Sequence, residues 1–136
     1  MRMWDEPILP NIKDNFWELR DGVIAHEENP DTFEIPTKSE RESIGRGKAA
    51  KLIFDIETQD EDGTIRVSGE RMWVIVLSTK NGHYLGILDN EPSCIEPGTG
   101  GLEPGSKLWF KPEHVVGLSK PPIEYLIAAY PDEFGT

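Results

Sequence analysis

Two turn dipeptides, Asp62-Gly63 and Asn81-Gly82, do most to limit the folds open to this chain. Asx-Gly pairs readily adopt the positive φ angles that tight hairpin loops need, so each pair marks a reversal between antiparallel strands. The runs around them, Lys51–Glu57, Thr64–Leu77 and Tyr84–Leu88, have strand-like composition. The sequence therefore predicts three consecutive antiparallel strands in the middle of the chain.

The second of these runs contains both a glycine interruption and a fully apolar half. Thr64–Val67 returns from the first hairpin, Ser68-Gly69 interrupts it, and Met72–Leu77 is apolar on both alternating sets of positions. Apolar side chains on both faces need cover on both sides, which indicates a central strand. A glycine inside a strand often marks a bulge or bend. We therefore expect one long, bent strand with Gly69 at the bend.

Capping, proline and turn signals predict short elements elsewhere. These are a short imperfect helix within 16–24, an extended piece at 32–35, a capping-box helix from Thr37 to about Ile44, a strand at 107–110, a helical turn at 111–115 with Pro112 first, and a helix from Pro121 to about Tyr130 that Pro131 stops. The fold class is α+β, a strongly bent antiparallel sheet or small barrel of about five strands with short flanking helices. One domain of 136 residues is expected, with an N-terminal extension (1–28), a core (29–115) and a C-terminal helical segment (116–136).

The charge balance restricts the classes of partner. The chain has 25 acidic and 14 basic residues, a net charge of −11, which repels nucleic-acid phosphates and anionic membranes. A basic protein partner is one interpretation, and acidity that serves only solubility is the other. Cys94 is the only cysteine, and neither a long apolar run nor a signal-like start is present, so a cytoplasmic protein is expected.

Motifs for common chemistries are absent from the sequence. It has no phosphate loop, dinucleotide fingerprint, HExxH, CxxC or GxSxG motif, so we expect no cofactor. Its three histidines lack metal-ligand spacing, so we expect no metal site. Cys94 and His114 suggest a nucleophile and a base only if the fold joins them, and a half-buried structural thiol is the better interpretation.

Two groups of residues are candidates for binding. Glu70 and Arg71 could form a charged cluster with Trp73, Glu91 and His114, or simply pair with charges on neighbouring strands. The aromatic residues Trp73, Tyr84 and Trp109, with His114, could surround a pocket, although such residues more often pack in a core or at its rim. The tentative binding set is Glu70, Arg71, Trp73, Tyr84, Asn90, Glu91, Trp109 and His114.

Five segments, NPDTFEIP, GKAAKLIF, GERMWVIV, YLGILDNEP and GSKLWFKPEHV, resemble in order and wording a family of small bacterial domains. That family is similar to the immunity protein 33-like group, which includes presumed antidotes to polymorphic toxins. The resemblance covers about 29–115, and its most specific parts are Glu70–Val74 and Asn90–Pro92. The chain departs from the pattern at 58–68 and 98–101. The resemblance implies a non-enzymatic α+β module and identifies no catalytic residue.

Three hypotheses of function follow. The first is a non-enzymatic cytosolic protein-binding module, an immunity protein if the resemblance holds, whose acidic loops at Asp60–Asp62 and Glu91 meet a basic toxin. The alternative is a barrel-type domain that binds a small molecule or peptide at the aromatic residues. The third is an enzyme that uses Glu70, Arg71 and His114, and the missing motifs weigh against it. The oligomeric state is not determined by the sequence.

Overall fold

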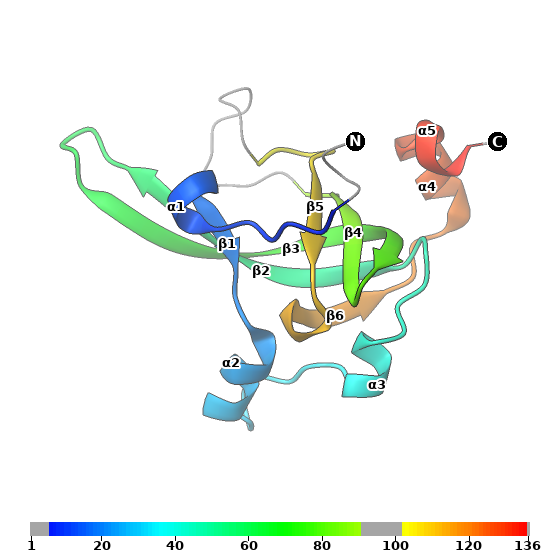
Figure 1. The fold of residues 1–136 in the computed structure, drawn as a ribbon, viewed down its shortest axis with the longest axis horizontal. Helices are drawn as coiled ribbons and strands as arrows, with labels where there is room; N and C mark the ends of the chain where they lie inside the picture. The colour runs from blue at the N-terminus through cyan, green and yellow to red at the C-terminus, as the bar shows by residue number, and fades with distance from the viewer. Residues whose placement is uncertain (1–5, 91–101, 136) are drawn as a thin grey trace.

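The computed structural model describes residues 6–90 and 102–135, in which six antiparallel strands form one strongly curled sheet (Figure 1). The order along the sheet is β1-β2-β3-β4-β5, and β6 pairs with the same edge of β2 as β1. The strands are β1 (Trp17–Leu19), β2 (Ala49–Gln59), β3 (Ile65–Lys80), β4 (His83–Leu88), β5 (Lys107–Phe110) and β6 (Val115–Ser119). The sheet is thus five strands wide, because β1 and β6 occupy successive parts of one edge.

Short helices flank the sheet (Figure 1), which confirms the predicted α+β class. One pair, α2 and α3, lies near the 3-10 turn η1, and another, α4 and α5, lies near the other end of the sheet. The helices are α1 (Ile12–Asn15), α2 (Gly22–Glu28), α3 (Lys38–Arg41), η1 (Pro112–His114), α4 (Ile123–Ala129) and α5 (Pro131–Phe134).

The predicted local signals are largely confirmed. Thr37 and Glu40 form the reciprocal capping box at the start of α3. At the second hairpin, Asn81 and Gly82 have φ angles of 51° and 75°, as a turn with two left-handed residues requires. The strand after the first hairpin runs unbroken for 16 residues as β3, with β2 on one side and β4 on the other where it is most apolar.

The expected long strand is confirmed as β3, but it has no bulge at Gly69. The register between β2 and β3 runs without a shift from Ala49↔Ile75 to Gln59↔Ile65, and the irregularity of β3 lies instead between Val76 and Ser78, against β4. At Gly69 a Cβ atom would stand 2.6 Å from Nη2 of Arg20. The glycine therefore makes room for this arginine, which forms an ion pair with Asp55 at 2.5 Å.

Three predicted boundaries also need correction. Residues 17–19 form strand β1 rather than part of a helix, the C-terminal segment opens with strand β6, and α3 ends at Arg41. The expected extended piece at 32–35 belongs to no strand of the sheet. Pro131 ends α4 but also begins α5, because a proline is well tolerated in the first turn of a helix. Both missed strands are short edge strands, whose pairing depends on β2, a partner distant in the sequence.

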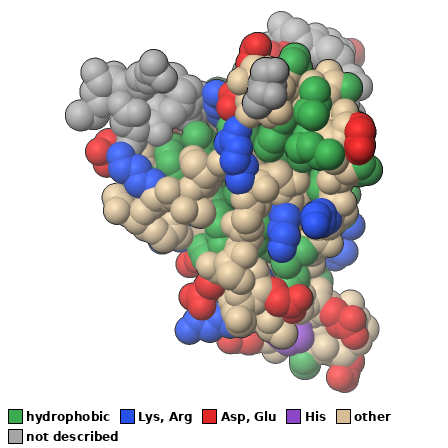
Figure 2. Space-filling model, turned by 90° about the vertical axis from the view of Figure 1, so that its right-hand side faces the viewer, with side chains coloured by type: hydrophobic (Ala, Val, Ile, Leu, Met, Phe, Trp, Pro, Cys, Tyr) green, Lys and Arg blue, Asp and Glu red, His purple; other side chains and the backbone are tan. Residues whose placement is uncertain are grey.

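Two apolar clusters pack on opposite faces of the sheet. The main core lies on the inner face of the curl and includes Phe54, Val74 and Phe110. A smaller cluster on the outer face joins Ala49 and Ile75 to side chains from α4 and α5. The C-terminal helices thus cover the outer face of the sheet around Ala49 and Ile75. On the side of the molecule seen in Figure 2, Lys and Arg side chains gather beside exposed hydrophobic surface.

Candidate functional site

The structure distributes the predicted site residues over both faces of the sheet. Glu70 and Arg71 are consecutive residues of β3, so their side chains leave opposite faces. Glu70 is half-buried opposite Phe54, a residue of the main core. Arg71 is exposed, and its guanidinium lies 5.1 Å from the centre of the Phe33 ring. Arg71 therefore makes a cation–π contact with an aromatic ring, and its side chain leaves the face of the sheet opposite to that of Glu70.

Trp73 and Asn90 act together in holding the chain after β4. The backbone N–H of Trp73 donates a hydrogen bond to Oδ1 of Asn90, and its carbonyl accepts one from the N–H of Asp89 at 2.9 Å. The ammonium of Lys51 lies 4.9 Å from the centre of the Trp73 ring. Asn90 thus has a structural contact. Glu91, predicted beside it, lies outside the described residues, as does Cys94.

The aromatic residues do not surround one pocket. Trp109 is on the outer face and is 3% exposed, and within the described ranges its indole N–H has no hydrogen-bond partner. It lines a small cavity of about 200 Å³ beneath residues 8–10. Tyr84 points from the inner face into a different and larger cavity. The pocket that the small-molecule hypothesis places around these residues is therefore not formed by them together.

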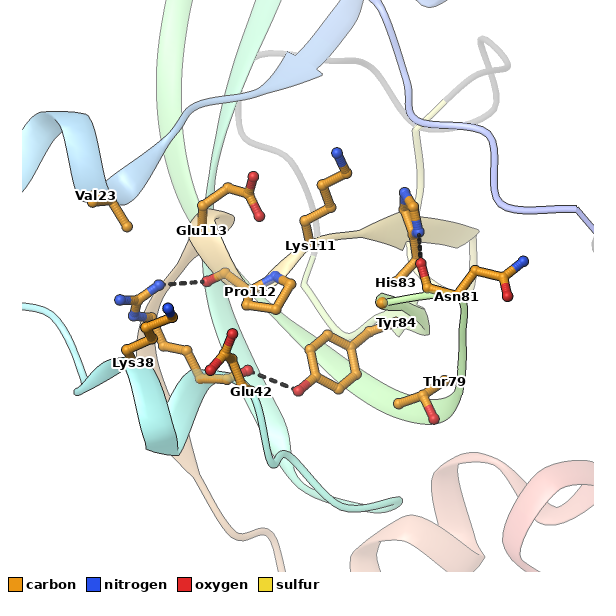
Figure 3. Close-up of a pocket in the computed structure, with 12 residues that line it drawn as sticks. Val23, Lys38, Glu42, Thr79, Asn81, His83, Tyr84, Lys111, Pro112 and Glu113 are labelled. Carbon is orange, nitrogen blue, oxygen red and sulfur yellow. Dashed lines mark hydrogen bonds between the residues drawn. The ribbon is translucent and has the colours of Figure 1, made fainter.

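The larger cavity, of about 830 Å³, lies between α3, η1 and the β3–β4 hairpin (Figure 3). The Tyr84 hydroxyl donates to the carbonyl of Arg41 at 2.7 Å and accepts from the N–H of Ile44 at 3.2 Å. Buried Arg41 donates in turn to the carbonyls of Pro36 and Pro112. These groups are occupied in joining α3 to the sheet. The remaining charged side chains of the lining include both signs, on Lys38, Glu42, Lys111 and Glu113, and His83 lies among them.

His114, at the end of η1, is buried, and its Nδ1 accepts a hydrogen bond from the N–H of Lys111 at 2.9 Å. Burial lowers the pKa of His114 from its ordinary value of 6.5, and Lys111 and His83 add to the effect, while the charges of Glu113 and Asp21 oppose it. The ring is therefore kept neutral, with its remaining proton on Nε2. This state suits a structural acceptor.

We expect stability to fall as the pH drops below about 6.5, since the unfolded chain then binds a proton that folded His114 resists. A His114→Asn variant should lose stability at pH 7 but show a shallower decline between pH 7 and pH 5. Urea unfolding at several pH values measures this, with His83→Asn as the control. Equal slopes for the wild type and His114→Asn would contradict the assignment.

A cluster that sequence reasoning missed holds the C-terminal helices to the sheet. The Asp89 carboxylate accepts hydrogen bonds from the Tyr125 hydroxyl, at 2.7 and 2.9 Å, and from the Tyr130 hydroxyl. Burial and its hydrogen bond to Asp89 raise the pKa of Tyr130. The pKa of Tyr125 is raised mainly by its own hydrogen bond to Asp89. Both phenols therefore stay protonated as donors. Nothing in the local pattern connects a residue after β4 with tyrosines more than 30 positions later.

The most protruding feature is the hairpin between β2 and β3, which extends past α1 and β1 (Figure 1). We call its outer part, residues 58–69, the arm. From Asp60 to Gly69 every residue but Asp60 is exposed, and Asp60 itself is half-buried. In the described part of the chain no strand pairs with the outer edges of the arm. The pairing of β1 with β2 ends at Ile56, and the pairing of β4 with β3 begins only at Val74.

The tip of the arm is acidic and locally ordered. Asp60 forms an ion pair with Arg66 at 2.6 Å, and Asp62 accepts a hydrogen bond from the N–H of Thr64 at 2.9 Å. That backbone bond lowers the pKa of Asp62, so it remains charged. Next to the tip, Ile65 is 62% exposed and Val67 is 56% exposed. The arm therefore offers free strand edges, apolar side chains and negative charge together.

In residues 6–90 and 102–135, no group of three or more His, Cys, Asp or Glu side chains is placed to hold a metal ion. None of the helices in these ranges is long and apolar enough to cross a membrane. The chain matches no family model, no curated protein and no solved structure. The likeness to the immunity-protein group therefore stays a prediction that rests on the sequence motifs.

Proposed function

We propose that this protein is a non-enzymatic, cytosolic protein-binding module that grips a basic partner with its arm. The observation that carries the proposal is the exposure of the arm, which extends beyond the core with Ile65 and Val67 in solvent. Exposed apolar strands with unpaired edges are a liability in a solitary protein and a common means of recognising another chain. A partner that covers the arm would remove this liability.

Charge complementarity favours a basic partner. The acidic residues Asp60, Glu61 and Asp62 lie at the tip, in a chain with a net charge of −11. Such an arrangement steers association with a cationic surface and fixes orientation more than it adds affinity. The resemblance to immunity proteins agrees with this proposal, because an antidote acts by occluding a toxin, and the partner proposed is then a basic toxin.

We expect neutralisation of the tip to weaken binding to the product of the adjacent gene, the partner that an immunity role implies. In the triple variant Asp60→Asn, Glu61→Gln, Asp62→Asn, the amides keep the acceptor oxygens that order the turn. The association rate at low salt should fall about tenfold, and its dependence on salt should flatten. Surface plasmon resonance at several ionic strengths measures both effects.

The matched control makes the same change of charge elsewhere. Glu27→Gln, Glu28→Gln and Asp31→Asn alter three exposed acidic residues at and just after the end of α2, away from the arm. This variant should bind almost as the wild type does. Equal loss in both triple variants would reduce the effect to net charge alone, and the absence of any complex with the neighbouring gene product would count against the immunity role.

A further inference from the structure

A second surface, on the side of the molecule shown in Figure 2, combines positive charge with an apolar wall. It is a groove of about 810 Å³ where the start of β2 meets the end of β6 and the C-terminal helices. We call it the basic groove. Its charged residues are Arg46, Lys48 and Lys120, and no acidic side chain is among the described residues that line it.

The two lysines line the groove next to the ends of neighbouring strands. The antiparallel register pairs Ala49, the first residue of β2, with Ser119, the last residue of β6, and Lys48 and Lys120 are the next residues just beyond this pair. Like charges held close together repel each other and are destabilising. An anion bound between these two ammonium groups would convert that repulsion into attraction.

The fold itself does not neutralise these charges. Within the described part of the chain, no ion pair involves Lys48 or Lys120. Arg46 donates to two backbone carbonyls, those of Leu77 and Glu133, and its guanidinium lies 4.8 Å from the centre of the Phe134 ring. Three cations without a carboxylate partner are notable in a chain with 25 acidic residues.

The rest of the groove lining is apolar, and contacts with the sheet hold it in place. Pro121, Pro122 and Ile123 lie beside the lysines, and Ile123 is 53% exposed. Leu126, which is 2% exposed, anchors α4 on the sheet, and the contact with Arg46 holds the Phe134 ring. The volume lies in the range of small-molecule sites, which are mostly apolar with a few converging polar groups.

We propose that the basic groove binds a small amphipathic carboxylate. Its anionic head would lie between Lys48 and Lys120, and its hydrocarbon part would lie on Ile123 and the two prolines. Such a ligand matches both the charged and the apolar part of the groove. A sugar would make little contact with the apolar residues, and a neutral hydrocarbon would leave the charges of the two lysines without a counter-ion. The site is separate from the arm, so its test is independent of the proposed protein partner.

The test uses the full chain and a matched set of probes, octanoate, octan-1-ol and butanoate, with isothermal titration calorimetry. Octanoate should bind more tightly than either, because octan-1-ol lacks the charge and butanoate lacks most of the apolar contact. Lys48→Gln and Lys120→Gln should each weaken octanoate binding by at least about fivefold. Without ligand, both variants should be as stable as the wild type or slightly more stable, since repulsion is relieved.

Lys38→Gln and Lys111→Gln, in the cavity of Figure 3, serve as controls and should leave octanoate binding unchanged. Three outcomes would overturn the proposal: no octanoate binding to the wild type, equal binding of octanoate and octan-1-ol, or lysine variants of the groove that bind as the wild type does. Each can be observed whether or not the arm binds a protein.

Discussion

Replacing Gly86 with alanine should lower the free energy of unfolding by about 1–3 kcal/mol, the usual cost of overpacking a core. Gly86 is buried in β4, and an added Cβ would stand 2.3 Å from Cγ1 of Val74, 3.0 Å from the carbonyl oxygen of Ile75 and 3.2 Å from Cε1 of Phe110. Val74 and Phe110 belong to the fully buried core. Neither the two side chains nor the backbone can retreat without disturbing the packing around them.

Gly45→Ala is the matched control for this substitution. Gly45 has nothing within 4 Å of the position of a Cβ and does not adopt a left-handed conformation. Its replacement should change the stability by no more than about 0.5 kcal/mol. Urea unfolding followed by tryptophan fluorescence measures both variants. If Gly86→Ala proved as stable as Gly45→Ala, this would contradict the claim that Val74, Ile75 and Phe110 leave no room for a Cβ at Gly86.

Removing the Asp89 carboxylate should have an effect of similar size. Asp89→Ala leaves the Tyr125 and Tyr130 hydroxyls without their acceptor, and hydrogen bonds to a charged group contribute about 1.5–3 kcal/mol each. Because Tyr125 is 44% exposed, water competes for its hydroxyl and its share is smaller, and we expect a loss of about 2–3 kcal/mol in total. Amide hydrogen exchange should quicken first at 123–134, since the carboxylate ties α4 and α5 to the end of β4.

A double-mutant cycle with Tyr130→Phe separates this hydrogen bond from general damage. If Asp89 acts through Tyr130, the losses from Asp89→Ala and Tyr130→Phe will not add in the double variant. The cluster also predicts an alkaline dependence. The folded pKa of Tyr130 is raised above its ordinary value of 10.0, so stability should fall as the pH rises past about 10. Tyr130→Phe should show a smaller fall, and strict additivity in the cycle would argue against the clamp.

The sequence by itself determined the local structure of the chain. The Asn81-Gly82 and Asp62-Gly63 turns, the capping box at Thr37 and the apolar run at 72–77 act over a few residues. Backbone conformation, capping and strand alternation depend on such near neighbours, so these elements could be predicted without knowledge of the fold. The acidic tip of the arm was predicted for the same reason, because turn loops lie at the surface.

Only the tertiary structure decided which distant residues meet. Strands β1 and β6 are too short to be stable or to be identified alone, and they form because β2 offers both an edge. The pairing of β2 with β6 brings Lys48 and Lys120 to one groove, and the docking of α4 and α5 brings two tyrosines to Asp89. Even Gly69, suggestive of a bulge in the sequence, is explained by an arginine 49 residues earlier. Such contacts depend on how the whole sheet curls, which local periodicity does not encode.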